Sequence, residues 1–136
     1  MESGLHHTVL KGDVMAKTAT GGVFWADDPA VEQPRLDGNE TCITGPMFGH
    51  KMMGARDDAG VLESDLLAAV GLDPTAFKVF AKLAEGTRRP IFVRPGDLTT
   101  EAHQDGIVVS FFLPKGCYAS VMLREFASEG AADADG

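Results

Sequence analysis

The chain has 136 residues, of which 44% are hydrophobic and 24% charged, and this composition is typical of one soluble globular domain. Its formal net charge of −8 argues against a protein that holds nucleic acid through overall charge. We expect a cytoplasmic protein, because no apolar run approaches the roughly 20 residues that cross a bilayer and no signal peptide is visible. Cys42 and Cys117 are too few for a disulfide framework, and we expect two reduced thiols.

Short β-like runs begin the chain. Residues 8–10 and 22–25 are rich in β-branched and aromatic residues, and glycines between them mark turns. The polar, proline-containing residues 27–40 predict a long loop or an excursion toward a substrate. Residues 41–44 predict a further short strand that ends at Gly45-Pro46.

Two helices are predicted in the middle of the chain. Asp57 and Asp58 can cap the first, and Gly71 ends it. The pair Asp73-Pro74 begins the second, since proline is favoured at the first helical position, and Gly86 supplies a left-handed end. The apolar residues expected to face the core are Leu62, Leu66 and Val70 in the first helix and Phe77, Phe80 and Leu83 in the second.

The last part of the chain is expected to be mainly β. Residues 91–93 predict a strand, residues 95–105 a turn or loop, and residues 107–113 the strongest strand, whose Val and Phe content indicates burial on both faces. Residues 118–126 predict a helix, and the small, acidic residues 127–136 a disordered tail. The predicted fold class is therefore α+β, with a short-stranded mixed or antiparallel sheet and about three helices.

Residue types and spacing indicate no catalytic or metal site. The four histidines lack the ligand spacing of zinc sites, no nucleophile or phosphate-loop motif occurs, and the 20 acidic residues make chance carboxylate pairs too common to interpret. One basic stretch contains Lys78, Lys82, Arg88, Arg89 and Arg94, opposed only by Glu85. It predicts either a local positive face for nucleic acid or a solvated helix face that runs into a turn.

Residues 111–120 are predicted to run from a buried strand through a glycine turn into a helix. Gly116 permits the turn, which places Cys117 and Tyr118 at a helix N-terminus, where free amides favour anions such as phosphate. An aromatic ring at such a turn can stack on an unpaired base. The structural alternative is a simple strand–turn–helix corner with Tyr118 as a partly buried wedge, and the residues alone favour that alternative.

The same segment carries a family resemblance. L-P-K-G-C-Y-A-S-V-M-L-R-E at residues 113–125 closely resembles the C-terminal signature of the tRNA pseudouridine synthase D (TruD) family. Further stretches resemble the family in the same order: V-L-K-G-D-V-M at 9–15, E-Q-P-R at 32–35, T-G-P-M-F-G at 44–49 and G-T-R-R-P at 86–90. Cys117 and Ser120 stand where the family usually has Ser and Thr, and these near-isosteric changes leave the resemblance intact.

The resemblance implies an enzyme that isomerises a uridine of tRNA to pseudouridine without a metal or organic cofactor. In such enzymes an aspartate acts on the flipped-out nucleotide, so that the N-glycosidic bond is cleaved and re-formed to carbon. By resemblance, residues 1–90 are the latter part of the family's insertion domain and residues 91–126 are the last elements of its catalytic core.

The resemblance also implies roles for two sets of residues. Tyr118, Gly116 and Cys117 are expected at the wall of the active site, with Tyr118 stacking on the base or shaping the pocket. Arg88 and Arg89 match the family's basic pair, which either contacts phosphate of the tRNA or closes the insertion domain onto the core.

The family's catalytic motif, which resembles G-x-K-D-[KR], does not occur in the chain, so we expect no catalytic residue and no activity from the chain alone. An engineered fragment, a truncated gene product and one half of a split enzyme, completed by a separate N-terminal catalytic segment, all fit this expectation. Two alternatives stay open. One is a non-catalytic RNA-binding module, and the other is a protein-interaction fragment in which the strand at residues 107–113 needs a partner chain.

Overall fold

The computed structural model describes residues 7–125 and has an α+β fold, which confirms the predicted class. The chain divides into two compact units between Phe92 and Val93. Every strand pairing in the described residues is antiparallel. Within these residues, no helix has the length and apolar content needed to cross a bilayer.

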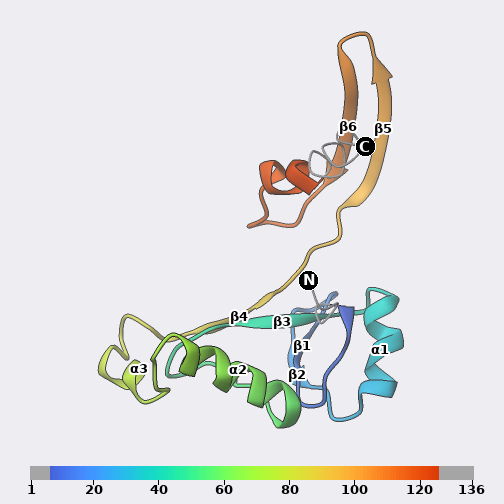
Figure 1. Ribbon diagram of the computed structural model, residues 1–136. Coiled ribbons are helices and arrows are strands. Elements are labelled where there is room, and N and C mark those ends of the chain that lie inside the picture. The colour runs from blue at the N-terminus through green and yellow to red at the C-terminus, as the bar shows by residue number, and fades with distance from the viewer. Residues whose placement is uncertain (1–6, 126–136) are drawn as a thin grey trace, which may run out of the picture. The chain divides into compact units, whose positions relative to one another are not determined.

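The first unit is built on a four-stranded sheet in the order β2-β1-β3-β4 (Figure 1). The strands are β1 (Val14–Lys17), β2 (Val23–Trp25), β3 (Thr41–Met47) and β4 (Thr87–Pro90). Met15 on β1 pairs with Phe24 on β2 and with Ile43 on β3, while Gly45 on β3 pairs with Arg89 on β4. The edge strand β4 therefore carries the basic pair.

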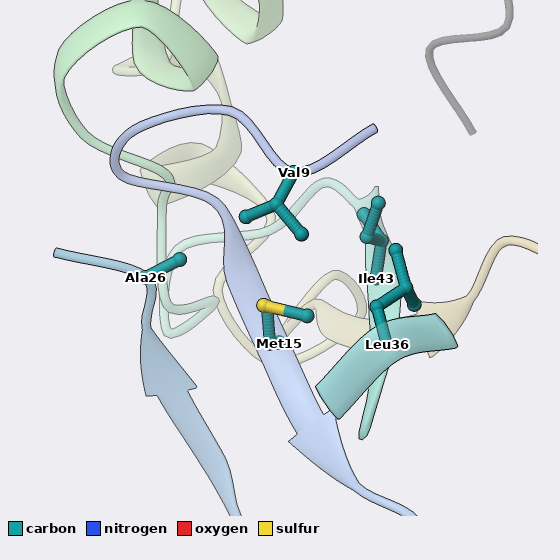
Figure 2. Close-up of a cluster of buried hydrophobic side chains, with 5 residues drawn as sticks. All are labelled: Val9, Met15, Ala26, Leu36 and Ile43. Carbon is teal, nitrogen blue, oxygen red and sulfur yellow. The ribbon is translucent and has the colours of Figure 1, made fainter. Parts of the chain in front are cut away.

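Three helices accompany this sheet, namely α1 (Pro29–Asp37), α2 (Asp57–Ala69) and the short α3 (Ala76–Val79). The helix α1 lies against β3, and Figure 1 shows α2 extending along β3 and β4. The core joins α1 to the sheet through Val9, Met15, Ala26, Leu36 and Ile43, which form one buried cluster (Figure 2). Burial of a side chain as large as Leu or Met contributes about 1.5–3 kcal/mol, so this cluster anchors the unit.

The first strand lies later than predicted. Residues 8–10 are not a strand, because the N–H of Val9 donates to Oε1 of Gln33 at 2.9 Å instead of joining a ladder. The N–H of Leu10 donates to the Asp13 carboxylate at 2.7 Å, which closes a turn. The strand β1 starts directly after that turn, and its buried residues Val14, Met15 and Ala16 were missed. The second β-like run does form a strand, β2.

The loop predicted for residues 27–40 is wrong, because most of it is α1. Asp28 caps this helix by accepting a hydrogen bond from the N–H of Ala30 at 3.0 Å, and Pro29 stands in the first turn. Leu36 is the buried residue of α1, so the sequence of this helix has almost no apolar periodicity from which a helix could be predicted.

The strand predicted for residues 41–44 is confirmed but does not end at Gly45-Pro46. It continues to Met47, because the part of β3 beyond Thr44 pairs with β4 and no longer with β1. Pro46 lies in this part of β3, which pairs with one neighbouring strand only, and a proline is tolerated where a strand has an unpaired side.

The helix predicted after Asp57 is confirmed as α2, but its expected cap and its expected apolar face are wrong. Arg56 is the N-cap residue and no side chain caps the helix, since Asp57 and Asp58 lie in its first turn. Ala59 and Leu67 are the buried residues, whereas Leu62, Leu66 and Val70 are exposed in this structure. The second predicted helix is reduced to α3, because the Asp73 carboxylate binds the N–H and hydroxyl of Thr75 in a tight turn and the chain turns again at Phe80. Phe80 and Leu83 are exposed, so the predicted stripe does not form.

The strand predicted at residues 91–93 lies earlier in the chain, as β4 at Thr87–Pro90. Of residues 91–93, only Ile91 continues the pairing, since its N–H donates to the carbonyl of Ile43 at 3.1 Å. The second unit contains a two-stranded hairpin of β5 (Gly96–His103) and β6 (Gly106–Phe112). The loop expected at residues 95–105 is therefore wrong for β5, while the strand expected at 107–113 is confirmed as β6.

The expected burial of β6 on both faces is wrong for the described residues. Ile107, Val108 and Phe112 are exposed, because a two-stranded hairpin has no further layer of its own to cover either face.

Residues 119–125 are helical, in agreement with the helix expected at 118–126, whose last residue, Phe126, lies outside the described part. The tail predicted at residues 127–136 also lies outside it.

Candidate functional site

A tight turn in the second unit connects β6 to the helical residues 119–125. The N–H of Cys117 donates to the carbonyl of Pro114 at 3.2 Å and closes the turn. Gly116 has φ +93°, a left-handed conformation, and a Cβ there would meet no atom within 4 Å. Glycine is thus favoured at this position for its backbone conformation and not for lack of space.

Tyr118 stands where this turn becomes a helix. Its carbonyl accepts hydrogen bonds from the N–H groups of Val121 at 3.1 Å and Met122 at 3.4 Å, which fixes the backbone. Tyr118 is 74% exposed, so it is not the partly buried wedge of the structural alternative. Cys117 beside it is a half-buried free thiol. The turn therefore presents one aromatic ring to the outside of this unit.

Arg88, the first residue of the basic pair, is buried in the first unit. Its side chain is 4% exposed and forms an ion pair with Glu63 on α2, with an Nη1–Oε1 distance of 2.6 Å. Its Nε donates to the hydroxyl of Thr44 at 3.0 Å, and its Nη2 donates to the Thr44 carbonyl at 2.7 Å. With these donors occupied, the guanidinium joins β3, β4 and α2.

Arg89, the second residue of the pair, has a different environment. Neighbouring strand residues point to opposite faces of a sheet, so Arg89 lies on the face of β4 away from Arg88 and is exposed. Lys78 and Lys82 are exposed as well. Arg88 and Arg89 belong to the first unit, whereas Gly116, Cys117 and Tyr118 belong to the second.

Several motif residues of the first unit hold its segments together. Gly12 has φ +83°, and a Cβ there would lie 2.0 Å from the carbonyl oxygen of Arg56. Gln33 ties α1 to residues 7 and 9 through Nε2–O and N–Oε1 distances of 2.9 Å each. Asp13 is buried, and desolvation raises the pKa of its carboxyl despite the hydrogen bond from Leu10 and the nearby Arg88. These residues serve the fold, while Tyr118 and Arg89 remain accessible.

One feature was missed by sequence reasoning. A cleft of about 400 Å³ opens on the first unit between the loop after β3, α2 and the segment around α3. Phe48, His50, Ser64, Phe77 and Lys78 are among the residues that line it. They are scattered along the chain, and of the aromatic residues among them only Phe77 carried a signal, which was interpreted as core packing.

A family model described as tRNA pseudouridine synthase D (TruD) matches residues 1–126. The chain belongs to the TruD family. The five motif stretches that carried the resemblance all fall inside the matched residues. Tyr118 and the turn before it thus lie in a TruD signature that the structure leaves exposed.

Curated TruD relatives are similar over nearly the whole chain. A tRNA pseudouridine synthase D of Geobacter metallireducens is 45% identical over 93% of the chain, which corresponds to 31% of that protein. A tRNA pseudouridine synthase D of Anaeromyxobacter sp. is 43% identical over 96% of the chain and 37% of the relative, and one of Thermus thermophilus is 40% identical over 98% and 36%. The chain spans about a third of the length of these relatives.

A solved structure has a similar TruD fold. The crystal structure titled as a putative tRNA pseudouridine synthase D of Methanosarcina mazei matches 88% of the chain and 31% of the solved chain, with a TM-score of 0.64. The sequence identity is 23%, so this likeness concerns the fold alone.

Proposed function

We propose that the chain forms part of a tRNA pseudouridine synthase and supplies one wall of the pocket that holds the uridine. The observation that carries this proposal is the exposed ring of Tyr118, set at a turn within the TruD signature. A base that has left its helical stack loses its stacking partners, and an aromatic side chain can replace them. Tyr118 is assigned this role, with Gly116 shaping the turn and Cys117 lining it.

The two units correspond to the two parts of the enzyme in this proposal. The division between Phe92 and Val93 lies close to the boundary at residues 90 and 91 expected between the insertion domain and the catalytic core. Residues 1–90 then belong to the insertion domain and residues 91–126 to the end of the catalytic core. The catalytic aspartate is contributed by another part of the full-length protein, so the chain alone has no activity. The completed enzyme acts on cytoplasmic tRNA and needs no cofactor.

The basic pair divides its work in this proposal. Arg89 is exposed on β4 and contacts a phosphate of the tRNA, a role that positions RNA without reading its sequence. Arg88 uses its donors inside the first unit and positions β4, so it acts on RNA binding only through Arg89.

The test is a chimera in which residues 1–126 replace the matching part of the Geobacter metallireducens relative. Pseudouridine formed in a tRNA transcript is then mapped. The chimera is expected to be active and the chain alone inactive. Tyr118→Ala in the chimera is expected to lower the rate on the order of tenfold, the size of a lost base–aromatic stack, while Tyr118→Phe keeps most activity.

Three results would count against the proposal. Turnover by the chain alone would show that it contains its own nucleophile. An active chimera in which Tyr118→Ala changes nothing would remove the assigned pocket wall. If tRNA binds but the chimera forms no pseudouridine, the alternative of a non-catalytic RNA-binding module is favoured.

A second candidate function is a partner-dependent interaction fragment, which the β5–β6 hairpin favours. Its two strands have exposed apolar residues, including Leu98, Ile107 and Phe112, and an isolated two-stranded hairpin is marginally stable in water. Both hairpin edges are able to accept a further strand. A monomer at high concentration in sedimentation velocity would speak against self-association through this hairpin.

A further inference from the structure

The cleft on the first unit is separate from the residues assigned above, since neither Arg88 nor Arg89 lines it. One wall is α2, which contributes Ser64 and Leu67, and the opposite wall is α3 with Phe77 and Lys78. The loop after β3 closes the third side with Phe48 and His50. A volume of about 400 Å³ lies within the range of pockets that bind small organic groups.

The loop after β3, which closes one side of the cleft, is held by backbone contacts. The N–H groups of His50 and Lys51 donate to the carbonyls of Ala84 and Glu85 at 3.1 and 2.8 Å. At the same place the chain segments touch so closely that a Cβ on Gly49 would lie 2.2 Å from the nitrogen of Gly86. The loop therefore has little freedom to collapse into the cleft, which is largely preformed.

Two parallel aromatic rings give the cleft an apolar lining. The rings of Phe48 and Phe77 have centroids 6.2 Å apart and planes inclined by 11°. Both side chains are half-buried, so part of each ring faces the cleft and remains open to a ligand. Planar heterocycles such as nucleobases stack on surfaces of this kind.

The polar groups of the cleft favour an anionic, hydrogen-bonding ligand. Glu63 also lines the cleft, but its carboxylate is neutralised by Arg88 at 2.6 Å and accepts the N–H of Ala55 at 3.1 Å. Lys78 at the rim is exposed and forms no ion pair among residues 7–125. Nδ1 of His50 faces the carbonyl of Ala84 at 3.2 Å, and when it carries the proton, Nε2 is an acceptor for a base N–H.

We propose that this cleft binds one unpaired nucleotide of the RNA. The base lies against Phe48 and Phe77, and Lys78 contacts a neighbouring phosphate. The choice of RNA as ligand rests on the proposed function, whereas the position of the site rests on the cleft alone. The competing occupant is an apolar side chain from another part of the full-length protein. Such a side chain would contact the rings of Phe48 and Phe77 but would not depend on Lys78.

The test is a titration of the full 136-residue chain with a short oligouridylate, followed by NMR chemical shifts and by affinity at several salt concentrations. Shifts are expected for the Phe48, His50 and Phe77 signals. Ser64→Phe fills the cleft from α2 and is expected to weaken binding at least about tenfold. Leu66→Phe, on the opposite side of the same helix, is the matched control and should bind normally.

The phosphate contact is tested with two lysines. Lys78→Ala is expected to reduce the slope of log affinity against log salt by about 0.7, the value for one phosphate contact on a single strand. Lys82→Ala is the control, because Lys82 is exposed but does not line the cleft, and its slope should not change.

The outcomes separate this inference from the proposed function. Binding that survives Ser64→Phe while Tyr118→Ala abolishes it would overturn the cleft site and leave the pocket wall in place. Binding lost with Ser64→Phe but unaffected by Tyr118→Ala and Arg89→Ala would support the cleft and count against the assigned wall. A well-folded chain with no oligouridylate shifts at the cleft would overturn the inference and favour a protein side chain as occupant.

Discussion

Arg88 and Glu63 form an ion pair, with an Nη1–Oε1 distance of 2.6 Å, that joins the edge strand β4 to α2. The two side chains are 4% and 14% exposed, so little water competes for their hydrogen bonds. The next residue, Arg89, lies on the other face of the same strand and is exposed. Of these two adjacent arginines, Arg88 therefore stabilises the fold, whereas Arg89 is available at the surface.

Removing one partner of the pair leaves a buried charge without compensation. Arg88→Ala is expected to lower the free energy of unfolding by about 3–5 kcal/mol, and Glu63→Gln to act in the same direction. Arg89→Ala, the matched neighbour, is expected to change it by no more than about 0.5 kcal/mol. Urea denaturation followed by circular dichroism measures all three, and equal effects at the two arginines would contradict the assignment.

Gly12 is required at its position for two reasons: its φ is +83°, and any Cβ on it would lie 2.0 Å from the carbonyl oxygen of Arg56. Gly12→Ala is expected to destabilise the chain by more than about 1 kcal/mol. Gly54→Ala is the control, because a Cβ there meets no atom within 4 Å. A thermal scan should show a lower Tm for the first variant alone, and an unchanged Tm would mean that residues 11–13 do not dock as described.

Asp13 should make stability depend on pH in a defined direction. Desolvation raises the pKa of its carboxyl above 3.8, so the folded state favours the protonated form. The stability that protonated Asp13 contributes to the fold is fully present below pH 3.8 and is lost as the pH rises through the folded-state pKa. Asp13→Asn mimics the neutral form, so its stability relative to wild type should increase as the pH rises from about 4 toward neutrality.

Asp73 provides a control, because the pKa of its carboxyl is shifted in the opposite direction. Hydrogen bonds from the hydroxyl and the N–H of Thr75 lower the pKa of its carboxyl, so the folded state favours the charged form. Asp73→Asn should therefore lose stability relative to wild type as the pH rises through the range below 3.8. Urea midpoints measured across the acid range test both variants, and parallel curves would contradict the two environments.

Tyr118 should matter for binding and not for stability. Its ring is exposed, so Tyr118→Ala is expected to change the free energy of unfolding by no more than about 0.5 kcal/mol. The same variant is expected to weaken tRNA binding. A large loss of stability in the denaturation curve would mean that the ring packs into the protein.

The β5–β6 hairpin should open more readily than the sheet of the first unit. Its strands bury little apolar surface, whereas Val14 and Met15 on β1 are fully buried. Hydrogen exchange is therefore expected to be faster at the amides of β6 than at those of β1. Similar protection in both would indicate that the hairpin is covered, for example by self-association.

Local sequence was sufficient where one residue type or one short pattern decides the structure. The segment from Asp57 to Gly71 has acidic residues in its first turn and a glycine after its end, and α2 forms there, although its buried face differs from the expected one. The Val- and Phe-rich run ending at Leu113 forms β6. The cap at Asp28-Pro29 was equally visible, but a polar segment with one buried residue, Leu36, gave no apolar period to support it.

The sequence by itself determined the family, because ordered motifs of specific composition need no knowledge of the fold. It also determined that a glycine turn leads to Tyr118. Only the tertiary structure decided that Arg88 is buried and Arg89 exposed, since that depends on which face of β4 meets α2. The same holds for the cleft, whose rings Phe48 and Phe77 are far apart in the chain and become neighbours only through packing.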